Sequence, residues 1–592
     1  MAAAALCAGV VAGCGDAPVG LPGGAAAGDP AGSGGGPPAG PLDAFACDPG
    51  LVAPELPLRR LSHTQYEHAV RDLVGVLVPS ERDVILAEID GALVTVPPDT
   101  RTGPDAKLGA MRRLDQTIYQ ETVDGAYAVG KAVGEAIVAT DARLEAAAGL
   151  CATDGDAGND AACVDDFIRR FGAHALRRPV TDEDVAYYRD VVGGSLERGD
   201  WVDVVTELLS APWLLYFVEL GEGDPALGPV PLGPYELASR LSFHFWQTLP
   251  DAELLAAAES GALLDDAGYQ AQVERLYADP RTLDALGELA GDWLMPQDLP
   301  DLAMNVGTPA FDAFRGELTP SHELRGDMLD ELGEMVAYYA HDTESGFDAF
   351  FASDRSFARS AELAAIYGVP RWDGGEPPQF AEPQRAGLLG RAALTASGLA
   401  TTRPILKGVF ARKALLCDRI EPPPADAMMV AAEAEAQSPA ASARQRAEAI
   451  SEARADCAAC HQQTINPLGF VTESFDGLGR FREMETVYAP SSGEALAEVP
   501  VDSAAVPRVV AGDARPASDT ATLARYMLES GKPQACFARH YFRFTFGRQE
   551  QDEADGCTLE EMYRGLLEGQ SFGSVLRVLA LRPEFRRRTI EP

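Results

Sequence analysis

The apolar residues of this chain recur at helical spacing along most of its length. The clearest case begins after Ser62, where Ser62 and Gln65 form the Ser-x-x-Gln pattern of a capping box. Apolar side chains then follow at intervals of three and four, the period that places them on one face of a helix. This stripe consists of Tyr66, Ala69, Val70, Leu73 and Leu77.

The same period predicts further helices downstream. A long second helix is expected to carry Leu108, Met111, Leu114, Ile118, Val129 and Val133. The next helix carries Phe167, Phe171 and Ala175, and Thr181 caps another that continues through Val185, Tyr188 and Val192. Two more helices are expected over residues 201–220 and 235–247. Strand alternation is almost absent, apart from a hairpin expected among the valines of residues 483–510. The pattern therefore predicts a mainly α protein, and 592 residues exceed what one core usually supports.

The N-terminus has the features of an export signal. Residues 1–13 form a short apolar run that ends in Val11-Ala12-Gly13-Cys14, which resembles the lipobox in which the cysteine becomes lipidated after cleavage. No Lys or Arg precedes this run, and a plain cleaved signal is the alternative. A tether rich in Gly, Ala and Pro follows. Elsewhere no run reaches the roughly 18 uncharged apolar residues of a membrane span, so we expect an exported periplasmic or cell-surface protein that is anchored only by lipid.

One motif points directly to a cofactor. Cys457-Ala458-Ala459-Cys460-His461 is a CxxCH sequence, in which two thiols bond to a haem and the histidine ligates the iron. Composition alone gives about 0.002 such motifs in a chain with 10 Cys and 8 His. A zinc site would need a second ligand pair nearby, and the next cysteine is Cys536. The motif therefore predicts covalent haem c, with a redox or metal site as the alternative.

The motif also predicts its supporting groups. We expect it at the C-terminal end of a helix that starts at Ser438-Pro439. His461 should ligate through Nε2 and donate from Nδ1 to a carbonyl oxygen. Pro467 is a candidate for that acceptor, with Asn466 and Gln463 as competitors, although Pro467-Leu468-Gly469 is equally well explained as a turn.

The second axial ligand of the iron is less defined. Met484 follows Arg480-Phe481-Arg482 at the entrance to the expected hairpin, where a loop could fold over the haem, and is the first candidate. Met527, Met562 and His540 are alternatives, and an open position is another. Met527 and His540 lie on expected helices, where a role in the core explains them equally well.

The remaining cysteines suggest disulfides, as expected for an exported chain. Six are left once Cys7, Cys14 and the haem pair are set aside. We expect local pairs Cys151–Cys163 and Cys536–Cys557, which leaves Cys47–Cys417, among the 15 possible arrangements.

The charge excludes one class of partner. Asp and Glu total 90 against 49 for Lys and Arg, a net charge of −41. A nucleic acid backbone would be repelled, whereas a basic redox protein would be attracted. Solubility outside the cell explains the acidity equally well.

Several blocks, in order, resemble one known family. These are Leu58-Arg59-Arg60-Leu61 through Arg71-Asp72-Leu73, Phe167 to Glu183, Glu236 to Phe243 with Trp246 and Pro250-Asp251, Arg385 to Leu389 with Leu416-Cys417, the haem motif with Pro467 to Phe470 and Phe475-Asp476, and Tyr541 to Phe544 with Gly547-Arg548. Together they look like the large secreted cytochrome-c-like proteins first recognised in planctomycetes, built from consecutive domains of unknown function. The resemblance implies a haem-bearing, mostly helical exported protein, but no particular activity.

These observations predict a multi-domain helical array with a small cytochrome-c-like haem segment and a minor β-hairpin. The expected divisions are a lipoprotein signal over 1–14, a tether over 15–50, helical domains over 51–150, 151–225 and 226–375, a haem-bearing domain over 376–512 and a C-terminal helical domain over 513–592.

Three functions fit this organisation. The motif favours a lipid-anchored monohaem protein that transfers single electrons to or from an exported oxidoreductase. The large helical region also suits a haem enzyme of the peroxidase or oxygenase type with an open distal site. Finally, a surface binding or scaffold protein could carry the haem domain as one module among several.

Overall fold

A computed structural model describes residues 44–102, 111–190, 196–294, 299–420 and 439–590. Helices account for 56% of the structure, and its strands form only small two-stranded sheets, which confirms a mainly α fold. No helix within these ranges has the length and apolar content that a membrane span requires.

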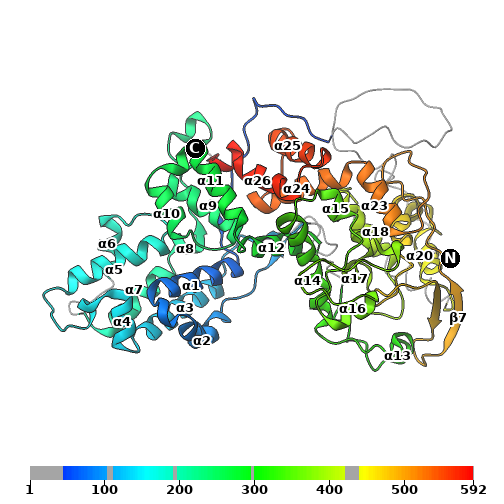
Figure 1. Cartoon of the computed structure of the whole chain (residues 1–592), viewed down its shortest axis with the longest axis horizontal. Helices are drawn as coiled ribbons and strands as arrows, with labels where there is room; N and C mark the ends of the chain where they lie inside the picture. The colour runs from blue at the N-terminus through cyan, green and yellow to red at the C-terminus, as the bar shows by residue number, and fades with distance from the viewer. Residues whose placement is uncertain (1–43, 103–110, 191–195, 295–298, 421–438, 591–592) are drawn as a thin grey trace, which may run out of the picture.

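The first helices form a separate N-terminal lobe, drawn in blue and cyan in Figure 1. They are α1 His63–Leu77, α2 Arg82–Leu93, α3 Gln120–Val138, α4 Asp141–Ala148, α5 Asp160–Ala175, α6 Asp182–Arg189, α7 Arg198–Leu209 and α8 Pro212–Leu215. One hydrophobic core joins all of them. The predicted division between residues 150 and 151 falls inside this core, because Leu144 of α4 and Cys163 of α5 both belong to it.

Two features of this lobe follow from single residues. Ser62 forms the predicted capping box with Gln65, and the predicted stripe of α1 is buried. Helices α3 and α7 pack closely because α3 has glycines where they cross. A Cβ atom on Gly130 would lie only 2.9 Å from the Thr206 Cα atom.

The second predicted helix is wrong in its first half. Leu108 lies outside the described residues, and residues 111–119 are not helical; α3 begins only at Gln120. Met111 is buried in the core of the other lobe, and the Arg112 amide donates to the Asp292 carbonyl of α12 at 3.2 Å. Contacts with the other lobe therefore hold these apolar residues in an extended arm, despite their helical spacing.

The rest of the chain forms a larger main lobe around a second hydrophobic core. Its longer helices are α9 Pro234–Trp246, α10 Ala252–Glu259, α11 Asp266–Ala278, α12 Thr282–Leu294, α13 Pro309–Arg315, α14 Leu324–Ala337, α16 Ala361–Tyr367, α18 Pro404–Phe410, α20 Ala443–Ser451, α23 Thr520–Glu529, α24 Lys532–Phe546, α25 Gly556–Leu567 and α26 Phe572–Leu581. Shorter ones are α15 Phe347–Phe351, α17 Ala392–Thr395, α21 Ala455–Cys460 and α22 Asn466–Phe470, with π-helical turns at Tyr338–Asp342, Ala411–Leu415 and His461–Ile465. The 3₁₀ turns are Pro79–Glu81, Leu150–Ala152, Pro225–Leu227, Ala262–Leu264, Pro383–Arg385, Leu388–Gly390 and Pro583–Arg586.

The described residues contain four antiparallel strand pairs, two of which, β1–β4 and β5–β8, join distant parts of the chain. They are β1 Arg59–Arg60 with β4 Tyr216–Phe217, β2 Arg101–Thr102 with β3 Arg113–Leu114, β5 Val230–Pro231 with β8 Arg587–Arg588, and β6 Met484–Tyr488 with β7 Ala495–Pro500. The last pair is the predicted hairpin, with Met484 opposite Pro500 and Tyr488 opposite Ala495.

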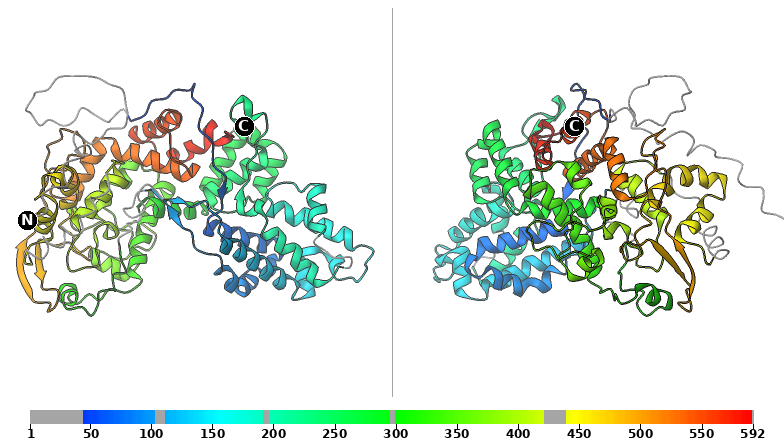
Figure 2. Two further views of the ribbon diagram at one scale, coloured as in Figure 1. Left: turned by 180° about the vertical axis from the view of Figure 1, so that it is seen from behind. Right: turned by 45° about the vertical axis from the view of Figure 1, so that its right-hand side comes forward.

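The segment before β1 lies along the end of the chain rather than on the N-terminal lobe. Figure 2 shows this dark blue strap, residues 44–58, passing beside the red C-terminal helices. Ala44 packs with Ala535 and Tyr563, the Phe45 and Tyr563 rings meet edge to face at 5.8 Å, and Leu56 is buried in the main core.

The disulfides agree only partly with the sequence prediction. Cys151–Cys163 forms as expected, with Cα atoms 5.9 Å apart. The other four cysteines exchange partners, since Cys47 bonds to Cys557 and Cys417 bonds to Cys536. The predicted pairs Cys536–Cys557 and Cys47–Cys417 are therefore wrong. The strap carries Cys47 to α25, and α24 places Cys536 beside the end of the turn that follows α18.

Candidate functional site

The CxxCH motif lies on a short helix between two others. Helix α20 starts after Ser442, whose hydroxyl accepts from the Gln445 amide at 3.2 Å, and it ends at Ser451. Arg454 is extended and α21 follows, ending at Cys460 as the motif predicted. The single helix expected from Ser438 is wrong, because Ser442 caps α20 and the backbone breaks before Ala455; Ser438 itself lies outside the described residues.

Helix α21 presents both cysteines of the motif. Cys457 and Cys460 are three positions apart, which is close to one helical turn, so they lie on the same face. Both are half-buried and thus partly open to solvent. His461 opens the π-helical turn immediately after Cys460, so the structure brings the three predicted residues together.

The ring of His461 is held by a neighbouring amide. Its Nδ1 lies 3.1 Å from Oδ1 of Asn466, and its Nε2 makes no hydrogen bond to any described residue. Burial lowers the pKa of His461, and the hydrogen bond to Asn466 opposes that shift in part. The imidazole is therefore neutral near pH 7, which is the form that binds metals.

Pro467 does not take the role expected for it. Its carbonyl accepts from the Val471 amide at 3.4 Å, at the C-terminal end of α22. The acceptor for the His461 Nδ1 is instead Asn466, one of the two competitors that the sequence suggested.

Asn466 is fully buried and joins three elements. Its Nδ2 donates to Oγ of Ser451 at 2.9 Å and to Oε1 of Glu452 at 2.8 Å, both at the end of α20. These two bonds fix the amide so that Oδ1 faces His461, because Nδ2 has no acceptor capacity. The orientation of the imidazole is thus set by α20 through α22.

Helix α18 clamps the same segment from the other side. A Cβ atom on Gly408 would lie 2.1 Å from the Ile465 carbonyl oxygen, and one on Gly469 would lie 1.9 Å from the Pro404 carbonyl oxygen. Only glycine permits such an approach, so α18 and α22 are in backbone contact on both sides of the π-helical turn.

A buried arginine anchors this turn to the main lobe. The Arg412 guanidinium donates to the Thr464 carbonyl at 3.0 Å, to the Pro507 carbonyl at 2.7 Å and to Asp418 at 3.0 Å. Arg412 has no exposed surface and also donates to the Arg508 carbonyl at 2.9 Å, so its four acceptors come from three separate segments. The turn that begins at His461 is therefore fixed from outside the motif as well as from within it.

The candidates for the second axial ligand lie in different environments. Met484 begins β6 and is 44% exposed, whereas Met527 and Met562 are buried in the main core. His540 is also buried; its Nε2 lies 3.0 Å from the Ala414 carbonyl oxygen and 3.3 Å from Sγ of Cys536. Met484 thus has the most accessible thioether of the three methionines and stays the predicted ligand. Cys14 lies outside the described residues.

Some supporting residues carry no recognisable sequence signal. These residues are Ser451, Gly408 and Arg412. They are either distant from the motif in sequence or of a type that is common throughout the chain, and only the packing of α18, α20 and α22 brings them to the motif. Asn466, by contrast, is close enough to His461 to be a candidate from spacing alone.

Comparison with known proteins finds two family models along the chain. Residues 232–369 match PSD4, a protein of unknown function (DUF1592), and residues 385–485 match PSCyt3, a protein of unknown function (DUF1588). The second match includes the whole CxxCH motif and its supporting residues. No curated protein and no solved structure matches the chain.

Proposed function

We propose, from its place among the planctomycete cytochrome-c-like proteins that carry consecutive DUF1592 and DUF1588 domains, that this chain is an exported c-type monohaem protein that transfers single electrons. In this proposal Cys457 and Cys460 hold the haem through thioether bonds and His461 ligates the iron. The partner is an exported oxidoreductase or its acceptor.

The observation that carries the proposal is the set of donors around His461. Two half-buried cysteines, Cys457 and Cys460, lie on one face of α21, the imidazole follows directly, and a buried amide fixes its Nδ1. The Nε2 atom makes no hydrogen bond to described residues. A histidine ligand with its second nitrogen held by a hydrogen bond is the usual arrangement at metal sites, so these residues fit a haem.

The chain itself would tune the site. When bound, the haem supplies a one-electron iron couple whose potential depends on ligands and surroundings. The Asn466 amide is a neutral acceptor for the His461 Nδ1, so it donates less charge to the imidazole than a carboxylate would. Arg412 and α18 keep the turn from shifting, which limits rearrangement when the charge on the iron changes.

Export and lipid attachment are part of the same proposal. The lipobox ending at Cys14 and the disulfides between described residues support an oxidising location outside the cytoplasm. A net charge of −41 supports a basic redox partner. Replacing Cys14 with Ser should move the protein from the membrane fraction to the soluble fraction of the cell envelope; unchanged fractionation would refute lipid attachment there.

Spectroscopy of the matured protein tests the haem proposal. The full chain is co-expressed with a cytochrome c maturation system, denatured and examined for haem that stays with the polypeptide. We expect covalent haem in the native chain and in Gln463→Ala, an exposed residue of the same turn, and none in the double variant Cys457→Ala, Cys460→Ala. Native chain without covalent haem would overturn the proposal.

The spectrum also separates electron transfer from catalysis. A low-spin reduced spectrum that Met484→Ala converts to high spin supports an electron carrier with Met484 as second ligand. A high-spin ferric spectrum in the native chain that shifts with peroxide would instead favour the haem enzyme.

A further inference from the structure

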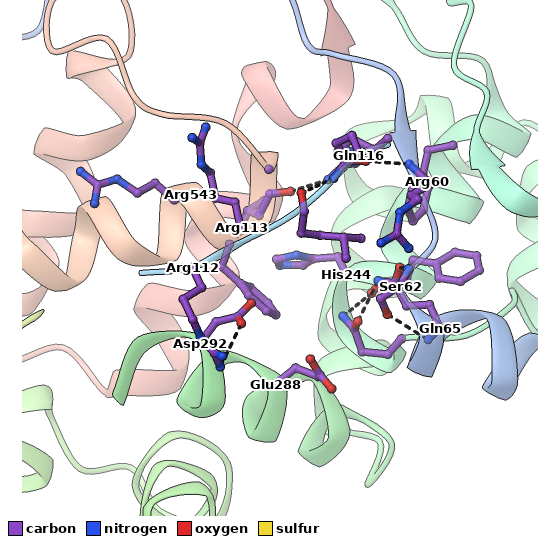
Figure 3. A pocket seen from close by; sticks show the side chains of 18 of the residues that line it. Arg60, Ser62, Gln65, Arg112, Arg113, Gln116, His244, Glu288, Asp292 and Arg543 are labelled. Carbon is purple, nitrogen blue, oxygen red and sulfur yellow. Dashed lines mark hydrogen bonds and ion pairs between the residues drawn. The ribbon is translucent and has the colours of Figure 1, made fainter. Parts of the chain in front are cut away.

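A cavity of about 100 Å³ lies where the two lobes meet, far along the chain from the CxxCH motif. Its walls come from β1 and α1, from the β2–β3 arm, from α9 and α12, and from the end of α24. Figure 3 shows His244 of α9 between the arginines of the arm and the residues Ser62 and Gln65 at the start of α1. The cavity is large enough for a small molecule or for several waters.

The charge of this cavity is opposite to that of the protein. Its lining has two carboxylates, Glu288 and Asp292, in a chain whose net charge is −41. The arginines that line it are Arg59, Arg60, Arg101, Arg112, Arg113, Arg240 and Arg543. Seven guanidinium groups around one cavity require either internal partners or an anionic ligand.

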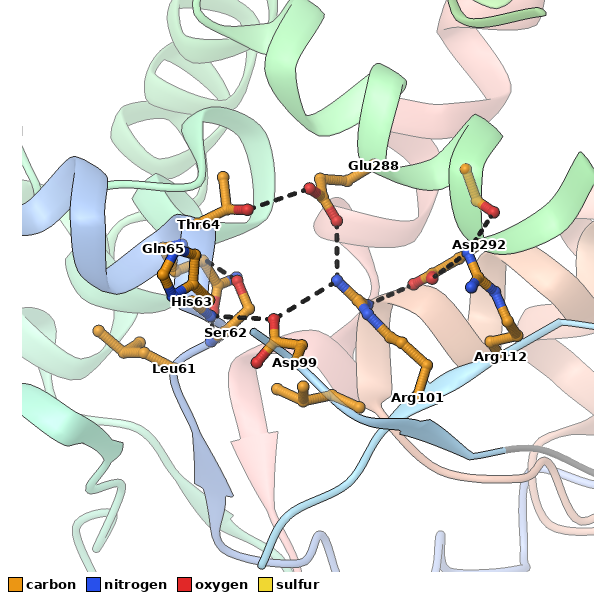
Figure 4. Close-up of polar contacts among 12 residues, drawn as sticks. Leu61, Ser62, His63, Thr64, Gln65, Asp99, Arg101, Arg112, Glu288 and Asp292 are labelled. Carbon is orange, nitrogen blue, oxygen red and sulfur yellow. Dashed lines mark hydrogen bonds and ion pairs between the residues drawn. The ribbon is translucent and has the colours of Figure 1, made fainter. Parts of the chain in front are cut away.

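Four of these arginines have close internal partners, and a fifth lies near one. Arg101 contacts Asp292 at 2.7 Å and Glu288 at 2.9 Å, which ties the arm to α12 (Figure 4). The other ion pairs are Arg60–Asp99 at 2.9 Å, Arg112–Asp292 at 3.7 Å, Arg240–Glu219 at 2.5 Å and Arg543–Glu550 at 2.6 Å. These ion pairs explain why the paired arginines are present: they stabilise the junction between the lobes.

The other two arginines, Arg59 and Arg113, have no such ion pair to explain their presence at the junction. Neither has a carboxylate within 4.0 Å among the described residues. Arg59 donates from Nη1 to the Thr545 carbonyl at 2.9 Å and lies over the Phe217 ring. Burial lowers the pKa of Arg59 to about 10, although the Glu219 carboxylate opposes the shift. The side chain of Arg113 has no hydrogen bond or ion pair to the described residues, and its Nε is buried.

The cavity also has polar groups without partners. Thr545 is only 7% exposed, and no described group bonds to its hydroxyl oxygen, Oγ1. The Nε2 atom of His244 lies 3.0 Å from the Tyr541 hydroxyl oxygen. The Tyr541 hydroxyl donates its own proton to the Leu576 carbonyl. The Nε2 of His244 must therefore carry a proton and donate, which leaves Nδ1 as a proton acceptor. Burial lowers the pKa of His244 to about 3, so the ring is neutral at physiological pH.

We propose that this cavity binds a small hydroxy acid, with its carboxylate between Arg59 and Arg113 and its hydroxyl donating to Nδ1 of His244. The planar forks of two guanidinium groups suit a carboxylate, and a neutral imidazole accepts a hydroxyl proton. Thr545 would supply a further hydrogen bond. The site uses both lobes, so the ligand also stabilises their arrangement, and it is independent of the haem proposal.

Calorimetric titration of the full purified chain tests this site. Glycolate and acetate are compared at constant ionic strength, with sodium chloride as the balancing salt. We expect saturable binding of glycolate, at least fivefold tighter than acetate because acetate has no hydroxyl for His244. Arg113→Gln should weaken glycolate at least tenfold, since it removes a charged hydrogen-bond donor.

Two further variants separate binding from folding. Thr545→Val keeps the shape of the side chain and should weaken glycolate severalfold, whereas Arg170→Gln, a surface arginine paired with Asp166 in the N-terminal lobe, should bind like the native chain. Circular dichroism confirms that each variant is folded. The proposal is overturned if no probe gives saturable binding, if Arg113→Gln binds as tightly as Arg170→Gln, or if acetate binds as tightly as glycolate.

Discussion

Replacing Asn466 with Ala should loosen the segment that carries the haem motif. The change removes three hydrogen bonds at once, those to His461, Ser451 and Glu452. A neutral hydrogen bond contributes about 0.5–1.5 kcal/mol and one to a charged group about 1.5–3 kcal/mol. Because the three share one side chain and are not additive, we expect a loss of about 3 kcal/mol in local stability.

Hydrogen exchange measures this loss where it occurs. The described residues contain two large hydrophobic cores and several disulfides, so one global unfolding transition is not assumed. A local loss of about 3 kcal/mol corresponds to roughly hundredfold faster exchange of protected amides. We expect this acceleration in peptides covering residues 443–470, with no change in the N-terminal lobe.

The matched control is Gln463→Ala, because Gln463 is an exposed amide on the same turn. It should leave exchange within about twofold of the native chain, as expected for a surface substitution. Equal exchange in Asn466→Ala and Gln463→Ala would refute the claim that Asn466 holds the turn. In matured protein, Asn466→Ala should also shift the reduction potential, because the His461 Nδ1 loses its acceptor.

Three further predictions concern the surrounding fold. Arg412→Met should cost about 3–5 kcal/mol, because it removes the charged donor from three carbonyl groups and leaves Asp418 with Lys532 alone as a cationic partner among the described residues. Thermal denaturation should show a large decrease in melting temperature compared with the surface control Arg525→Met. Gly469→Ala should prevent folding of the motif segment, since its Cβ would lie 1.9 Å from the Pro404 carbonyl oxygen. In Gly287→Ala, the control in α12, the added Cβ meets nothing within 4 Å, so this variant should be neutral or stabilised by up to about 1 kcal/mol. Soluble yield and melting temperature distinguish the two variants. Burial alone would raise the pKa of Glu550, but Arg543 and Arg539 outweigh burial and lower that pKa to about 2. The ionised Glu550 carboxylate therefore stabilises the folded protein above pH 4.5, and this contribution is lost as the pH falls toward 2. Melting temperatures across that range should therefore fall less steeply in Glu550→Gln than in the native chain, and parallel curves would contradict this assignment.

The sequence could predict features that depend on neighbouring residues. The capping box at Ser62, the disulfide Cys151–Cys163, the hairpin after Arg482 and the end of a helix at Cys460 all involve groups close together in the chain. Local hydrogen bonding and periodicity are sufficient to indicate such features.

Features that depend on distant contacts could not be predicted in this way. Residues 111–118 have helical spacing, yet Met111 is buried in the other lobe and the segment is extended. Cys47 and Cys557 are 510 residues apart, so nothing in their surroundings indicates that they meet. Arg412 reaches the motif only through packing, and Arg113 is noteworthy only because the fold leaves it without a partner.

The Cys47–Cys557 disulfide determines how mechanical force enters the protein. Tension applied to the chain ahead of residue 47 passes through the sulfur atoms into α25, and from there into the main core. Strand β1 and the N-terminal lobe lie beyond the crosslink and bear none of that tension directly. If the protein is tethered through its N-terminus, the load falls on the C-terminal helices, and the junction between the lobes stays unstrained while the body is pulled.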